Sequence, residues 1–177
     1  MTALVFVDAN VLVYARDPRD AMKRATAGEW LRLLWSQERG RTSVQVLNDY
    51  YDVITRVFSP AVKREDAWED VKFYLSAWSP QSLNEEVIEC AHDIEARYRL
   101  NWWDCLVVAA ALAQNCVLLL SEVLPDGADY GGVIVRSPFT LRIAEESGAY
   151  SVPPQQISRH RGRGRPRRST RASSTSA

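Results

Sequence analysis

Three short apolar runs predict the strands of a central sheet. They cover residues 4–7, 117–120 and 133–135, and they contain only Leu, Val, Ile and Phe. Apolar runs of this length without alternating polar residues are typical of strands that are buried on both faces, as in a parallel sheet. Residues 41–43 can add only a shorter strand.

The segments between these runs have the periodicity of helices. Apolar side chains recur every three or four positions from residue 21 to about 40, and in residues 44–58, 64–77 and 85–98. Residues 104–113 are Ala-rich and have no polar residue after Asp104. Gly40 is the expected C-cap of the first of these helices, and Ser82 with Glu85 resembles a capping box before the fourth. Strands that alternate with helices predict an α/β/α sandwich, with a mainly parallel sheet flanked by helices.

The composition changes near residue 153 and divides the chain. Residues 1–152 have the pattern of one folded domain, whereas residues 153–177 are rich in Arg, Ser, Gly and Pro without apolar periodicity and are expected to form a disordered tail. Seven of the 22 basic residues, all arginines, follow Pro154, which leaves 15 basic against 22 acidic residues before it, a net charge of −7. This balance argues against a body that binds nucleic acid by bulk charge alone.

The tail contains a short motif of its own. Residues 162–168 include the sequence Arg-Gly-Arg-Pro, which resembles an AT-hook and suggests that the tail binds nucleic acid. The alternative is a low-complexity extension with incidental affinity for any polyanion.

The cysteines and the N-terminus indicate a cytoplasmic protein. Cys90, Cys105 and Cys116 are odd in number and lack C-x-x-C spacing, so we expect buried free thiols in a reducing compartment. The first apolar run is interrupted at Asp8 and follows no basic segment, which excludes a signal peptide, and no run is long enough to cross a membrane.

Three aspartates provide the candidate chemistry. Asp8 directly follows the first strand, at the edge where α/β sheets build their sites, although it could equally cap the next helix. Asp49 lies within the second amphipathic helix, and Asp104 opens the apolar helix. Each lies in an otherwise apolar stretch without a nearby Lys or Arg, where an unpaired carboxylate is costly. Converging acids without His or Cys favour Mg²⁺ or Mn²⁺, which orients water at a phosphodiester; the alternative for each aspartate alone is a cap or surface residue.

Residues 7–10, 43–51 and 103–111 resemble a PIN domain, and more narrowly the VapC-type toxins of bacterial toxin–antitoxin pairs. Further matches at residues 121–127, 132–133 and 138–139 extend the resemblance to about residue 140. It implies a metal-dependent endoribonuclease that hydrolyses RNA phosphodiester bonds with Mg²⁺ or Mn²⁺, forms a homodimer and is silenced by a cognate antitoxin. The resemblance makes Asp8, Asp49 and Asp104 the catalytic and metal-binding acids, with Asn10 and Ser43 supporting them.

The chain departs from the pattern of these toxins at two positions. Asp49 stands where the family has a longer glutamate, and Val123 stands where the family has a fourth acid. Glu122 is a poor substitute because neighbouring side chains of an extended segment point to opposite sides. Asp126 is the candidate for an additional acid, although both Glu122 and Asp126 also fit as solvated loop residues. The rival function is therefore a catalytically weak module that binds RNA or a partner protein, aided by the basic tail.

Other chemistries find little support in the sequence. None of the eight glycines forms a phosphate-binding loop after the first strand, and neither His92 nor His160 suits a Ser or Cys nucleophile. Trp102 and Trp103 could stack on nucleic-acid bases, but aromatic residues at a helix start are more often packing residues.

Overall fold

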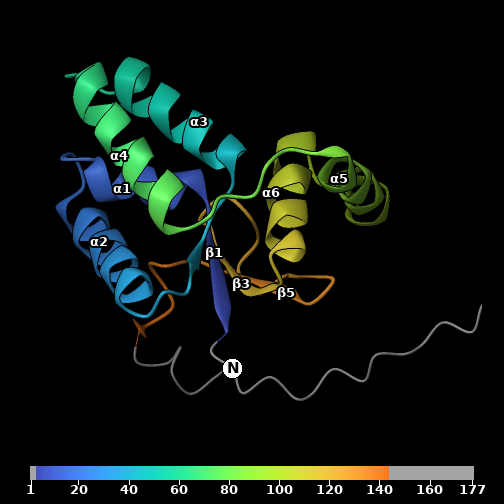
Figure 1. Cartoon of the computed structure of the whole chain (residues 1–177). Helices are drawn as coiled ribbons and strands as arrows, with labels where there is room; N and C mark the ends of the chain where they lie inside the picture. Colours follow the sequence, from blue (N-terminus) through green and yellow to red (C-terminus); the bar gives the residue numbers. More distant parts are fainter. Residues whose placement is uncertain (1–2, 144–177) are drawn as a thin grey trace, which may run out of the picture.

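A five-stranded sheet lies at the centre of the structure, a computed structural model that describes residues 3–143 (Figure 1). Its strands are β1 (Leu4–Val7), β2 (Gly40–Arg41), β3 (Cys116–Leu120), β4 (Asp129–Tyr130) and β5 (Val133–Arg136). They lie in the order β2-β1-β3-β5-β4; the first four of this order are parallel, and β4 pairs antiparallel with β5. The mainly parallel sheet that the sequence predicts is therefore confirmed.

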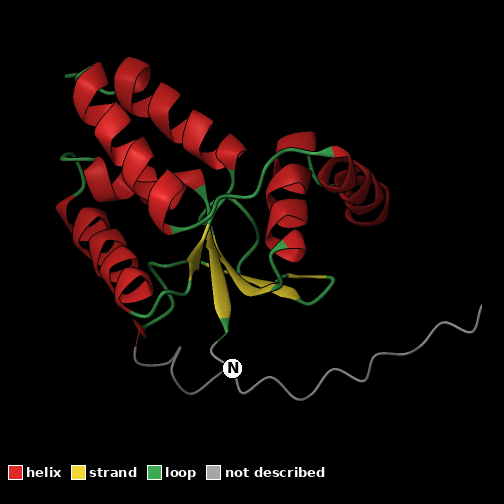
Figure 2. Ribbon diagram, viewed as in Figure 1, coloured by secondary structure: helices red, strands yellow, loops and turns green. Residues whose placement is uncertain are grey.

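Helices cover both faces of this sheet (Figures 1 and 2). One side carries α1 to α4, and the other carries α5 and α6. Their bounds are α1 (Ala9–Arg16), α2 (Ala21–Ser36), α3 (Val44–Asp52) with its π-helical continuation η1 (Val53–Val57), α4 (Arg64–Ala77), α5 (Glu85–Tyr98) and α6 (Trp102–Ala113). The α/β/α sandwich is thus confirmed.

The core forms around β1, β3 and α6. Val5, Phe6 and Val7 of β1 are completely buried, and so are the last three residues of β3. Helix α6 is buried over most of its surface, from Cys105 to Ala111, because it lies directly against the sheet and is covered by α5. This placement explains why its sequence has no polar interruption.

Two expected helix boundaries were wrong. Helix α2 ends at Ser36, and Gly40 lies in β2, where an added Cβ would come within 2.3 Å of the Trp78 ring. The glycine is therefore needed for a close approach rather than for a helix end. Helix α5 is capped by Asn84, whose Oδ1 accepts a hydrogen bond from the Val87 N–H at 3.1 Å, and not by Ser82. Asn is as good a cap as Ser, and it lies directly before the helix.

The remaining expectations are met in part. All three cysteines are free; Cys105 and Cys116 are buried and Cys90 is half-buried. No helix within residues 3–143 has the length and apolar character needed to cross a bilayer. The tail of residues 153–177, with its AT-hook-like motif, lies outside the described residues.

Candidate active site

Asp8 sits where β1 passes into α1. The backbone N–H of Asp8 donates to Leu120 O at 3.1 Å, so the carboxyl ends of β1 and β3 are joined at this point. Asp8 Oδ1 accepts the Ala9 N–H at 2.7 Å and makes Asp8 the N-cap of α1. The two alternatives for this residue therefore both hold: it ends a buried strand and it caps a helix. The side chain is only 7% exposed.

The second carboxylate oxygen of Asp8 is fixed by two neutral side chains. Asp8 Oδ2 accepts hydrogen bonds from Asn10 Nδ2 at 2.6 Å and from Ser121 Oγ at 2.7 Å. Asn10 is held in turn, because its Oδ1 accepts the Glu122 N–H at 3.1 Å. Asn10 thus orients Asp8, as the sequence suggests. Ser121 has the same role but was not predicted; its position directly after an apolar strand was the available signal.

Asp49 and Asp104 approach the same region from two helices. Asp49 lies on α3, one turn after Gln45. Asp104 lies in the first turn of α6, where the Asn101 side chain caps the helix by accepting the Asp104 N–H at 3.0 Å and also donates to Asp104 Oδ2. A carboxylate in the first helical turn is stabilised by the helix dipole.

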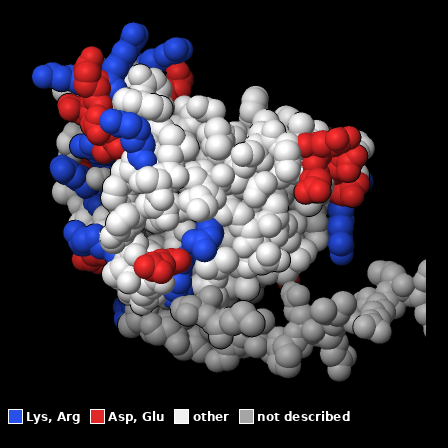
Figure 3. Space-filling model, in the orientation of Figure 1, with Lys and Arg blue, Asp and Glu red and all other residues white. Residues whose placement is uncertain are grey.

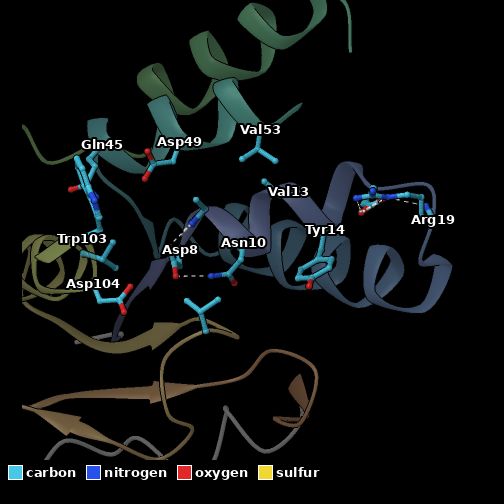
Figure 4. Close-up of a pocket in the computed structure, with 14 residues that line it drawn as sticks. Asp8, Asn10, Val13, Tyr14, Arg19, Gln45, Asp49, Val53, Trp103 and Asp104 are labelled. Atoms are coloured by element: carbon cyan, nitrogen blue, oxygen red, sulfur yellow. Dashed lines mark hydrogen bonds and ion pairs between the residues drawn. The ribbon is translucent and has the colours of Figure 1, made fainter. Parts of the chain in front are cut away.

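Asp8, Asp49 and Asp104 line one pocket of about 370 Å³ (Figure 4). Its wall is otherwise largely apolar. The other lining residues are Ala9, Asn10, Val13, Tyr14, Asp17, Arg19, Gln45, Val53, Trp103, Val107 and Val123. The lining residues of α3 and η1 are spaced by four, and those of α6 lie within one turn, so each helix presents one face to the pocket.

The pocket carries negative charge without a matching cation. Burial raises the pKa values of Asp8, Asp49 and Asp104, and the nearby Asp104 carboxylate raises that of Asp8 further. None of these three carboxylates pairs with a Lys or Arg of residues 3–143. Arg19 lines the far end of the pocket but is bound to Asp17 at 2.7 Å.

This donor set fits a hard divalent cation. Three carboxylates and no competing His or Cys are the ligands that Mg²⁺ and Mn²⁺ prefer. Within the described part of the chain no three such groups converge closely enough to bind one ion directly. Asp8, Asp49 and Asp104 are the residues that would hold such an ion, and Mg²⁺ can keep several waters beside its protein ligands.

Three other positions that the sequence analysis singled out add no acid to the pocket. Val123 lines the pocket and is 66% exposed, so the place of the usual fourth acid is occupied by an apolar side chain. Asp126 does not line the pocket; it accepts hydrogen bonds from Arg136 and from the Ser137 N–H, and these hold its pKa below the ordinary value despite partial burial. Ser43 does not line it either, and its Oγ caps α3 by accepting the Val46 N–H at 3.2 Å.

Charged side chains gather away from the middle of the molecular face in Figure 3. Basic and acidic groups lie together over the side that carries α3 and α4, and an acidic group lies over α5. Most of the centre of this face is uncharged, and one basic and one acidic group lie just below it. This face therefore carries charges of both signs and shows no broad basic patch.

Comparison with known proteins identifies the fold. The chain resembles VapBC2 of Rickettsia felis, solved bound to a DNA fragment from its promoter (TM-score 0.55, 16% identity, 76% of this chain and 98% of that chain). It also resembles FitAcB of Neisseria gonorrhoeae (0.56, 14%, 78% and 100%) and VapC20 of Mycobacterium tuberculosis, described as a sarcin–ricin loop cleaving toxin (0.51, 17%, 65% and 86%). No curated protein gives a significant match.

The family follows from the sequence match. The PIN domain model aligns with residues 5–122, a range that includes Asp8, Asp49 and Asp104. With this match over more than half of its length, the chain belongs to the PIN domain family.

Proposed function

We propose that the protein is a metal-dependent endoribonuclease and the toxin component of a type II toxin–antitoxin system. The observation that carries the proposal is the convergence of Asp8, Asp49 and Asp104 on one pocket without a counter-cation. Membership of the PIN family and the VapC fold of the solved neighbours support it.

Each site residue has a role that follows from its contacts. Asp8, Asp49 and Asp104 would hold Mg²⁺ or Mn²⁺, which supplies a water of lowered pKa and neutralises charge on the phosphodiester. Asn10 and Ser121 hold the Asp8 carboxylate in one orientation through Oδ2. Ser43 supports the site indirectly, because it caps the helix that carries Asp49.

The metal also governs access of RNA to the pocket. Three uncompensated carboxylates repel a phosphate backbone, so the metal-free protein should bind RNA weakly at this site. Binding as well as cleavage should therefore depend on the ion.

The deciding experiment is cleavage of a mixed RNA pool by purified protein with Mg²⁺, Mn²⁺ or EDTA. We expect metal-dependent cutting that is lost in Asp8→Asn and kept in Asp66→Asn, which removes an exposed carboxylate of α4 outside the pocket. Expression of the active protein should halt growth, and Asp8→Asn should relieve the effect.

One observation favours a second candidate, a binding module that is catalytically weak. Val123 stands in the pocket wall in place of an acid. A folded, metal-loaded sample that cuts no RNA in any condition would favour this function.

The remaining partners belong to the same proposal. A homodimer in the cytoplasm and a cognate antitoxin follow from the VapC resemblance, and sedimentation of the protein alone and with its antitoxin tests both. The basic tail would add affinity for nucleic acid. Unchanged binding after truncation at Pro153 would contradict that role.

A further inference from the structure

The tandem tryptophans at the start of α6 have different environments. Trp102 packs against the hydrophobic core, as expected of an aromatic residue at a helix start. Trp103 is 63% exposed and lines the pocket directly beside Asp104. Only Trp102 therefore contributes to the core, whereas the Trp103 indole stands beside the reactive acids.

The rest of the pocket suits a flat apolar group. Val13 of α1, Val53 of η1 and Val107 of α6 line it together with Trp103. The volume of about 370 Å³ lies within the range of small-molecule sites, about 300–1,000 Å³. One end of the pocket is thus acidic and the adjoining wall is apolar and aromatic, so a phosphate and a base of one nucleotide would meet different surfaces.

Asn10 and Gln45, whose side-chain amides line the pocket, differ in their hydrogen bonding. Both polar atoms of Asn10 are used, in hydrogen bonds to Asp8, Ser121 and the Glu122 N–H. Gln45 is 9% exposed. Its buried Nε2 has no partner that meets hydrogen-bond geometry in the described structure, but the side chain lies close enough to the Asp49 carboxylate to oppose the rise in the pKa of that group. A buried donor left unsatisfied is unfavourable by about 1–3 kcal/mol. Rotation of this amide toward the Asp49 carboxylate or toward the edge of a bound base would satisfy the donor.

We propose that this pocket seats one unpaired base of the RNA next to the phosphodiester that is cut, with the base stacked on Trp103 and its edge facing the amide of Gln45. This inference rests on the proposed ribonuclease function and adds the residues that would hold the base beside the cut. A base within a duplex cannot enter the pocket without leaving its stack.

The test compares Trp103→Ala and Trp103→Phe with Trp68→Ala. Trp68 is the matched control, because it is 49% exposed on α4 and does not line the pocket. On a single-stranded RNA with one cut site we expect Trp103→Ala to lower kcat/KM about tenfold, the scale of one base–aromatic stack. Trp103→Phe should keep most of the activity, Trp68→Ala should keep all of it, and the same RNA in a duplex should be cut poorly by every variant.

A substrate with an abasic nucleotide beside the cut separates stacking from a structural effect. On the abasic RNA, the kcat/KM of the wild type should fall by about the same factor by which Trp103→Ala lowers it on the intact RNA. The kcat/KM of Trp103→Ala should fall little further when the base is removed. Gln45→Met, which keeps the volume but removes the amide, should change the ranking of the four bases at this position.

If Trp103→Ala lowers kcat/KM relative to the wild type by the same factor on intact and on abasic RNA, the proposal is overturned, because Trp103 then has a structural role. Full activity of Trp103→Ala would also overturn the proposal. The group that covers the Trp103 indole would then be a protein partner and not a base. If the wild type cuts no RNA, the ribonuclease function fails separately. In that case, fluorescence anisotropy measures how tightly each variant binds labelled intact and abasic RNA in the presence of Mn²⁺. If every variant binds the two RNAs with equal affinity, the stacking site is overturned.

Discussion

Lys23 of α2 and Glu122, 99 positions apart in the sequence, form an ion pair beside the pocket. The Lys23 ammonium also lies 4.4 Å from the ring centre of Tyr14 and 5.0 Å from that of Phe139. Although partial burial opposes it, the contact with Lys23 keeps the pKa of Glu122 below its ordinary value. The acid next to Val123 is thus held against α2 and does not replace the missing fourth carboxylate.

Glu122→Gln should therefore leave metal-dependent cleavage within about twofold of the wild type. The variant loses a half-exposed ion pair, and the free energy of unfolding should fall by about 1 kcal/mol or less. Cleavage against metal concentration, together with urea denaturation, measures both quantities. A large increase in the metal concentration needed would show that Glu122 reaches the ion after all.

Val123→Asp should strengthen metal binding. The side chain lines the pocket and is largely exposed, so an aspartate adds a fourth carboxylate with little effect on stability. We expect half-maximal cleavage at a severalfold lower Mg²⁺ or Mn²⁺ concentration. Val57→Asp is the matched control, because Val57 is 63% exposed and lies outside the pocket lining. The same change in both variants would point to bulk charge instead.

Asp17 should contribute to stability in a defined pH range. The Arg19 guanidinium and the Arg19 N–H lower the pKa of Asp17 from 3.8 to about 2 in the folded protein. Because the folded pKa is the lower one, the contribution is complete above about pH 4 and is lost as the pH falls toward 2. Asp17→Asn should be less stable than the wild type at pH 5–7 and equally stable near pH 2. Denaturation curves across this range test it, and a difference that persists at pH 2 would contradict the mechanism.

Two glycines should respond oppositely to the same substitution. Gly28→Ala places a methyl group in open space within α2 and should stabilise the protein by about 0.5–1 kcal/mol. Gly40→Ala drives its Cβ into the Trp78 ring and should destabilise it by about 1–3 kcal/mol. Thermal unfolding of both variants measures the difference. Equal effects would mean that the Trp78 ring moves aside freely.

The sequence predicts the fold well where the signal is local. Uninterrupted apolar runs marked β1, β3 and β5, and period-four patterns marked the long helices. The two-residue strand β4 was not predicted, because its pairing with β5 follows from the turn at Gly131 and Gly132 rather than from an apolar run. The two helix boundaries, at the end of α2 and the start of α5, were wrong because several neighbouring residues have a similar propensity to cap a helix.

The candidate site is harder to predict because its residues come from helices and loops that are far apart in the sequence. Asp8, Asp49 and Asp104 were chosen from the sequence, and the structure brings all three to one pocket. Gln45 and Val53 lie one turn to either side of Asp49, so helical spacing could have found them. The position of Asp126 depends on hydrogen bonds with residues that are ten and eleven positions away, which no local pattern reveals. Ser43 instead makes a local N-cap, so helix-capping preference could have indicated its role.

The pairing of Val7 with Leu120 limits how the chain can change in length. Side chains alternate along a strand, so deleting one residue from β1 or β3 would turn the residue that follows to the opposite face. Asp8 and Ser121 would then no longer meet, even with both residues present. Insertions and deletions should accordingly be excluded from these two strands and tolerated in the turn that joins β4 to β5, where no site residue depends on the register.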